Sequence, residues 1–267
     1  MTYMIRPFNL GTSKKYNSYI EAMTLPSGHR LPILSTSYKF QLSTDSSYVT
    51  AGIYLAPHKM SGLSKSLCPW AKSCYKSCIY ETGRMPTHHD SYVRKTHALA
   101  IDSSLFIESL VMEIKVLAFQ CSLLGKSLWM RLDGTSDLLW HKHIDLERLV
   151  NDTTGLEGFY GYTKGPLAIR KPTSFNRFCY SLQEGDDSMK EARKWLQAGH
   201  SVAVVVSAKD YKKYKDDDRF IDGDKNDHRF LDENKIVLLK AKRLWKGKKY
   251  DSGIVTSMDR VFEVING

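Results

Sequence analysis

The stretch Ser201-Val202-Ala203-Val204-Val205-Val206-Ser207 decides the fold. Its five central residues are apolar and mostly β-branched, so a strand built from them would be buried on both faces. Strands that are apolar on both faces are typical of a parallel sheet covered on each side. The stretch therefore predicts a parallel sheet, with partner strands elsewhere in the chain.

Five further segments have the composition of strands, and helical segments separate them. The predicted strands are 48–56, 127–132, 158–163, 177–182 and 236–239; the predicted helices are 88–100, 104–124 and 144–150. A capping-box pattern from Ser188 to Glu191 opens another helix, which Gly199 ends. Strands that alternate with helices imply βαβ units. The sequence thus predicts an α/β fold whose six parallel strands form an open sheet or, as we expect, a partial (β/α)6-type barrel.

The composition is that of an ordinary globular protein. The 267 residues are 42% hydrophobic and 25% charged. We expect one α/β domain over residues 1–267, with a polar N-terminal extension (about 1–45) and a cysteine-bearing loop (about 57–86). The first residues lack the apolar core of a signal peptide, and no run approaches the ~18 apolar residues of a membrane span. We therefore expect a cytoplasmic protein without a membrane partner.

Three cysteines follow the first predicted strand with the spacing C-x5-C-x3-C: Cys68, Cys74 and Cys78. Thiolate ligands select zinc or iron–sulfur clusters. A structural zinc normally takes four protein ligands, and no residue at a typical zinc spacing completes this trio. A [4Fe–4S] cluster held by three cysteines would keep one iron open for another ligand. Cluster, zinc and simple packing of free thiols all remain open, and the cluster is our first choice.

The other two cysteines, Cys121 and Cys179, are expected to pack in the core, because free cysteine is among the most buried residue types. The total of five cysteines is odd and the expected compartment is reducing, so a disulfide framework is not expected.

Polar loops follow several of the other predicted strands. Parallel strands bring their carboxyl ends to one rim, where ligands bind in open α/β sheets and barrels. The loop 133–137 (DGTSD) offers Asp133 and Asp137 as acid and base, and Gly134, Thr135 and Ser136 as ligand contacts. It can equally be a turn whose side chains bond its own backbone. At two other strand ends, the candidate ligand-binding residues are Thr163 and Lys164, and Ser207 and Lys209.

The formal net charge of +10 favours polyanionic partners, so nucleic acid is a candidate partner. A basic run from Lys240 to Lys249 surrounds Trp245 and could grip a phosphate backbone, or could simply be a solvated surface. The acidic stretch from Asp222 to Asp227 resembles the start of a calcium-binding loop but lacks the glycine expected at its sixth position. A solvated loop, or one that closes over the site, is the preferred interpretation.

These motifs together resemble the phage "gene product 88" domain family over about residues 50 to 255. The resemblance lies in 55–78 (LAPHKMSGLSKSLCPWAKSCYKSC), in MRLDGTSDLLW, in YGYTK and in 221–242 (IDGDKNDHRFLDENKIVLLKAK). It implies a phage or prophage origin and little about chemistry. A weaker, architectural resemblance is to radical S-adenosylmethionine enzymes, which also carry three cysteines after the first strand of a partial barrel. Their usual spacing is C-x3-C-x2-C, from which this sequence departs.

Two hypotheses follow. The first is a [4Fe–4S] protein whose cluster keeps an open iron facing a small polar ligand, with S-adenosylmethionine as the first candidate; whether it performs radical-SAM-like redox chemistry stays open. The second is a non-enzymatic nucleic-acid-binding phage protein, stabilised by an iron–sulfur or zinc site. The substrate and the oligomeric state are not encoded in any recognisable pattern.

Overall fold

The computed structural model describes residues 14–35, 47–83, 85–232, 234–242 and 255–266. Within them lies a sheet of seven strands in the order β1-β2-β3-β4-β5-β7-β6, and every neighbouring pair is parallel. The strands are β1 (Tyr48–Gly52), β2 (Ser127–Arg131), β3 (Leu156–Thr163), β4 (Asn176–Ser181), β5 (Val202–Val206), β6 (Phe220–Asp222) and β7 (Ile236–Lys240). The sheet curls into a half-barrel that stays open between β1 and β6, as predicted.

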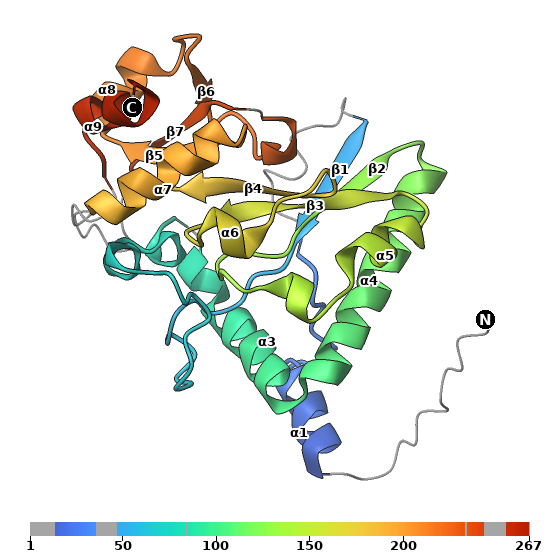
Figure 1. Ribbon diagram of the computed structural model, residues 1–267. Helices are drawn as coiled ribbons and strands as arrows, with labels where there is room; N and C mark the ends of the chain where they lie inside the picture. Colours follow the sequence, from blue (N-terminus) through green and yellow to red (C-terminus); the bar gives the residue numbers. More distant parts are fainter. Residues whose placement is uncertain (1–13, 36–46, 84, 233, 243–254, 267) are drawn as a thin grey trace.

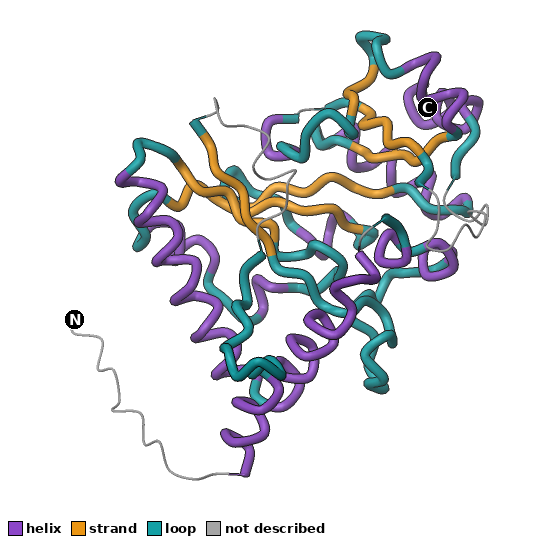
Figure 2. Tube along the Cα trace, turned by 180° about the vertical axis from the view of Figure 1, so that it is seen from behind, coloured by secondary structure: helices purple, strands orange, loops and turns teal. Residues whose placement is uncertain are grey.

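Helices occupy the connections between successive strands. They are α3 (His89–Ile101) and α4 (Ser103–Leu123), then α5 (Leu146–Asn151), α6 (Leu167–Arg170), α7 (Asp186–Gln197) and α8 (Ala208–Tyr214); α1 (Lys14–Ala22) and α9 (Met258–Asn266) lie outside this series. Crossovers between parallel strands are right-handed, so the strands β1 to β5, which lie in the sheet in chain order, carry their helices on one side. Figure 1 shows this one-sided arrangement, and the view from behind shows the strands side by side (Figure 2).

Two apolar clusters fill the space between the sheet and its helices. The first joins β1, β2 and β3 to α1, α3, α4 and α5, with Phe106, Leu110 and Ile114 of α4 fully buried. The second joins β4, β5 and β7 to α7, α8 and α9 around the fully buried Trp195. Asp102 caps α4, because its side chain accepts a hydrogen bond from the backbone N–H of Leu105.

The inner, concave face of the half-barrel is closed by a chain segment rather than by a helix layer. Alternate residues of β2 point to the two sides of the sheet, so Leu128 and Met130 join the first cluster while Trp129 faces inward. The 3-10 helix η5 (Arg229–Leu231) brings Phe230 against Trp129 and Tyr160. Aromatic side chains therefore cover the concave face next to β1, β2 and β3.

Several elements differ from the sequence-based expectation. The first strand ends at Gly52 instead of residue 56, and β6 is a seventh strand that the sequence did not reveal. The helix expected to begin at Ser188 begins at Asp186, because the Ser188 hydroxyl accepts from the backbone N–H of Gln183 and bonds Tyr180 instead of capping the helix. In the described part of the N-terminal region, α1 packs on the domain and buries Tyr19 in the first cluster.

Within the described residues, no helix is both long enough and apolar enough to cross a membrane.

Candidate functional site

The DGTSD loop lies at the carboxyl end of β2 and is held by its own side chains. Asp133 is buried, and its Oδ1 accepts hydrogen bonds from Ser136 Oγ (3.0 Å), the Leu138 backbone N–H (2.9 Å) and Trp140 Nε1 (3.1 Å). Thr135 Oγ1 donates to the carbonyl of Leu55 at 2.5 Å. The loop is thus an ordered turn that fixes the rim at the end of β2.

Gly134 is required in this loop because the backbone beside it leaves no room for a side chain. A Cβ there would stand 2.6 Å from the carbonyl oxygen of Ile53 and 2.6 Å from a ring carbon of Tyr54. The residue therefore serves close packing against the chain that leaves β1, which adds a structural role to the ligand contact predicted for it.

A buried arginine, Arg170 at the end of α6, connects both carboxylates of the loop. One of its terminal nitrogens pairs with Asp137, and the other donates to the Leu138 carbonyl at 2.6 Å and lies 3.6 Å from Asp133 Oδ2. Its guanidinium also lies over the ring of Trp70, 4.9 Å from the centroid, which ties the cysteine loop to the same group. Sequence reasoning missed Arg170, since an arginine in a four-residue helix gives no recognisable signal.

Two carboxylates and one guanidinium leave this buried cluster one negative charge in excess when both acids are ionised. Burial raises the pKa of Asp133 to about 6, opposed by Arg170 and reinforced by repulsion from Asp137. Burial also raises the pKa of Asp137, against the effect of Arg170 and of a hydrogen bond from the Lys164 backbone N–H. The pair therefore favours holding one proton in mildly acidic solution, which is the property needed for an acid–base role.

Of the other predicted rim residues, Thr163 and Lys164 join this cluster, whereas Ser207 and Lys209 serve elsewhere. The Thr163 hydroxyl bonds Asp137, and Lys164 Nζ bonds the hydroxyl (2.9 Å) and carbonyl (3.0 Å) of Ser181 at the end of β4. Ser207 caps α8 by accepting from the Asp210 backbone N–H, and Lys209 is exposed in the first turn of that helix. The rim cluster is therefore centred on β2 and β3.

The first half of the cysteine loop packs on this rim, and hydrogen bonds hold both of its ends. The Asp137 backbone N–H donates to the carbonyl of Leu67 at 2.9 Å, which joins the two loops directly. Beyond β4, the side chain of Gln183 accepts from the Lys72 backbone N–H (3.0 Å) and donates to the Trp70 carbonyl (3.0 Å). These contacts place the segment from Cys68 to Cys74 over the carboxyl ends of β2, β3 and β4.

The three thiols lie within electrostatic range of one another. Burial is the main cause that raises the pKa of Cys68 and of Cys78, the latter to about 12, and each is raised further by the neighbouring cysteines. Cys68 Sγ accepts from the His58 backbone N–H at 3.4 Å, while nearby Lys164 lowers the pKa of Cys78. Cys121 and Cys179 are buried on other parts of the fold, at 3% and 1% exposure, where packing was expected.

The thiols are gathered but not closed around a point. Among the described residues, no three His, Cys, Asp or Glu side chains are close enough together to hold a metal ion.

A second charged group that sequence reasoning did not place lies on the concave face beneath the rim. Arg131, at the end of β2, pairs with Asp227 at 2.6 Å, and the Tyr162 hydroxyl lies 3.4 Å from the same carboxylate. Asp227 belongs to the acidic stretch, so that stretch closes over the interior instead of lying free in solvent. Near it, Arg131 Nε, Tyr160 Oη and His228 Nε2 are buried without a partner in the described structure.

The basic run contributes little to the described surface. Lys240 is exposed, with its Nζ 5.7 Å from the centroid of the Tyr211 ring, and the part of the run from residue 243 to 249 lies outside the described residues.

Most of the chain, including the segments that build this rim, matches one protein family. A model of the phage family "Gene product 88" matches residues 32–257, which include the cysteine loop, the DGTSD loop and Arg170. The chain belongs to the Gene product 88 family. No curated protein and no solved structure matches it significantly. The family's description names no chemistry.

Proposed function

We propose that this Gene product 88 protein carries a [4Fe–4S] cluster on Cys68, Cys74 and Cys78, with one iron open toward the rim formed by the DGTSD loop and Lys164. The observation that carries the proposal is the gathering of the three thiols, from a loop after β1, beside the buried Asp133–Arg170–Asp137 group. A bound cluster would supply one-electron chemistry and a free coordination position.

The surroundings of the thiols support a negatively charged cluster. The backbone N–H of His58 donates to Cys68 Sγ, and hydrogen bonds to sulfur are among the features that tune such clusters. Lys164 lies near Cys78 and offers positive charge, while Tyr54, Tyr80 and Tyr92 pack around Cys78 and shield it from water. These features limit the solvent access that shortens the lifetime of exposed clusters.

The protein's own groups would position a ligand at the open iron. Asp137 is held by Arg170 and by the backbone of Lys164, so the DGTSD loop presents a fixed wall. An amino acid moiety could bind the iron through its amino and carboxylate groups while polar rim groups hold the remainder. S-adenosylmethionine is the first candidate, because it meets that description and because the half-barrel places the cysteine loop after its first strand.

The first test is chemical analysis of protein purified and reconstituted without oxygen. We expect about four irons and four acid-labile sulfides per chain, with a brown chromophore. Single substitutions Cys68→Ala, Cys74→Ala and Cys78→Ala should each abolish the chromophore. The matched controls Cys121→Ala and Cys179→Ala remove a thiol of the same chain away from the rim and should retain it. Stoichiometric zinc without labile sulfide would refute the cluster.

The second test concerns the open iron. S-adenosylmethionine added to the reduced cluster should change its electron paramagnetic resonance spectrum, because a ligand at one iron alters the electronic symmetry of the whole cluster. A spectrum unchanged at millimolar S-adenosylmethionine would reject this ligand while leaving the cluster assignment intact.

A further inference from the structure

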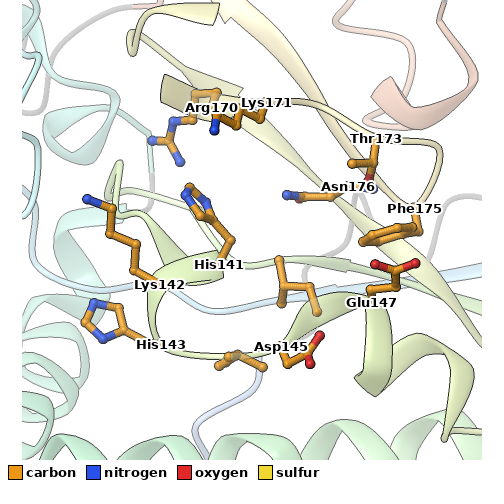
Figure 3. A pocket seen from close by; sticks show the side chains of 12 residues that line it. His141, Lys142, His143, Asp145, Glu147, Arg170, Lys171, Thr173, Phe175 and Asn176 are labelled. Carbon is orange, nitrogen blue, oxygen red and sulfur yellow. Dashed lines mark hydrogen bonds between the residues drawn. The ribbon is translucent and has the colours of Figure 1, made fainter. Parts of the chain in front are cut away.

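A separate hollow of about 450 Å³ lies beside the rim, on the side of the sheet that carries the helices. One wall is residues 141–147, which lead from the DGTSD loop into α5; the other is residues 170–176, which lead from α6 into β4 (Figure 3). The volume falls within the 300–1,000 Å³ typical of small-molecule sites. No residue of the cysteine loop lines it.

The two ends of the hollow differ in charge. Arg170, Lys171, His141 and Lys142 gather toward one end, whereas Glu147 and Phe175 lie toward the other (Figure 3). These cations act on His141: burial lowers its pKa, and Arg170, Lys142, Lys171 and His143 each lower it further. Because Asp133 and Asp137 balance Arg170, the free positive charge that would attract a phosphate group comes from the exposed Lys142 and Lys171.

The cationic end is also partly pre-organised. Arg170 is almost fully buried and is held by Asp137 and the Leu138 carbonyl, so its position is fixed before a ligand arrives. Lys171 adopts a left-handed backbone conformation (φ 46°) at the end of α6, where glycine is normally favoured.

The opposite end suits a nucleoside. The ring of Phe175 offers a face for a base, since stacking on an aromatic ring accepts any base. The exposed carboxylate of Glu147 can accept hydrogen bonds from ribose hydroxyls, a task that acidic side chains perform in dinucleotide-binding sites. The amide of Asn176, a mostly buried residue, is directed into the hollow between the two ends (Figure 3).

We propose that this hollow binds a mononucleotide, with the phosphates at Lys142 and Lys171 and the nucleoside between Phe175 and Glu147. Arg170, which lines the same end, connects the hollow to the carboxylates of the DGTSD loop, so occupancy of the hollow would stiffen the rim. The site shares Arg170 with the rim but contains no cysteine, so nucleotide binding does not require the thiols.

The test is calorimetric titration of the full chain with ADP, GDP, CDP and UDP in turn, and with inorganic phosphate and a single-stranded oligonucleotide as alternative phosphate sources. We expect at least one nucleotide to bind about tenfold or more tightly than inorganic phosphate, because only the nucleotide reaches both ends. Phe175→Ala should weaken nucleotide binding while changing phosphate binding little.

The test variant carries Lys142→Ala and Lys171→Ala together. The matched control carries Lys190→Ala and Lys212→Ala, which lie outside the hollow. All four lysines are exposed, so both double variants should fold, and both lower the net charge by the same amount. We expect about a tenfold or greater loss of nucleotide affinity in the first double variant alone. The proposal is overturned if both double variants lose affinity equally, or if phosphate binds as tightly as every nucleotide. It is also overturned if only the oligonucleotide binds, or if no nucleotide binds at millimolar concentration.

Nucleotide binding that persists in Cys74→Ser protein would separate this site from the cluster. If this variant loses the chromophore but still binds the nucleotide, the hollow binds its ligand without the cluster.

Discussion

The ring of Phe230 stacks on the indole of Trp129, with centroids 4.4 Å apart and an interplanar angle of 5°. Phe230 comes from η5, about a hundred residues along the chain from β2, and it also meets the edges of Tyr48 and Tyr160. This contact fastens the segment that closes the concave face, and it brings Asp227 to Arg131 at the end of the same strand.

Removal of this ring should therefore loosen the closing segment. Phe230→Ala is expected to lower the free energy of unfolding by about 3 kcal/mol, as large-to-small changes of buried aromatic residues do. Chemical denaturation measures the loss. The neighbouring Leu231→Ala, at a side chain that is 54% exposed, is the control and should change it by less than about 1 kcal/mol. Equal effects would mean that Phe230 does not anchor the segment.

Arg170 should be indispensable for stability. Arg170→Gln leaves Asp133 and Asp137 buried without their cation, and breaking a buried ion pair in this way costs about 3–5 kcal/mol. The control Arg148→Gln removes an exposed pair with Asp152 on α5, which contributes less than about 1 kcal/mol. Urea unfolding at neutral pH compares the two; a similar small loss in both would contradict the buried network.

The DGTSD loop should not tolerate a methyl group at Gly134. Gly134→Ala would bring its Cβ to 2.6 Å from backbone and ring atoms, and such overpacking costs about 1–3 kcal/mol. Gly161→Ala, whose nearest neighbour would be at 3.8 Å, is the matched control and should be accommodated. Thermal unfolding of both variants decides the matter, and a normal melting temperature for Gly134→Ala would show that the loop can move.

The buried Lys95 should make stability rise with pH in the alkaline range. Its Nζ donates to the Ile33 carbonyl (2.9 Å) and to Ser35 Oγ (3.1 Å), and burial lowers its pKa from 10.5 to about 8, partly offset by Glu113. Between pH 8 and 10.5 the unfolded chain holds the lysine proton more often than the folded chain does. The free energy of unfolding should therefore gain about 3 kcal/mol from this group across that window.

The measurement is urea unfolding at pH 8 and at pH 10.5 for the natural sequence and for Lys95→Met. Tyrosines and cysteines also titrate in this range, so the difference between the two proteins isolates the lysine. If both proteins respond identically to pH, the lysine is charged in the folded state and the assignment fails.

The parts of the fold that were predicted are those with a strong local signal. The run Ser201–Ser207 contains β5 (Val202–Val206), because β-branched apolar residues in a row have few alternatives to a buried strand. By contrast, β6 is three residues inside an acidic region, and only its pairing with β7 makes it a strand. Tertiary pairing of this kind leaves no trace in a short sequence window.

The candidate site divides in the same way. Strand ends predicted that Asp133, Asp137, Thr163 and Lys164 lie together, because the geometry of a parallel sheet follows from the strands alone. Arg170 and Asp227 could not be predicted as members of the site, because the contacts that fix them are distant in sequence. The contact of Arg170 with Asp137 spans 33 residues and that of Asp227 with Arg131 spans 96. The two roles of Ser207, cap or ligand contact, were locally indistinguishable; the structure shows the cap.

The order of the last two strands in the sheet constrains the order in which the chain can fold while it is being synthesised. β6 precedes β7 in the chain but lies outside it, and its sheet partner is β7. During synthesis, residues 220–222 have no strand to pair with until residues 236–240 have paired with β5. A chain interrupted between these segments would present Val202–Val206 as a bare, apolar edge that other strands can pair with. Premature termination in this short interval should thus yield an aggregating product, whereas the full chain covers its own edge.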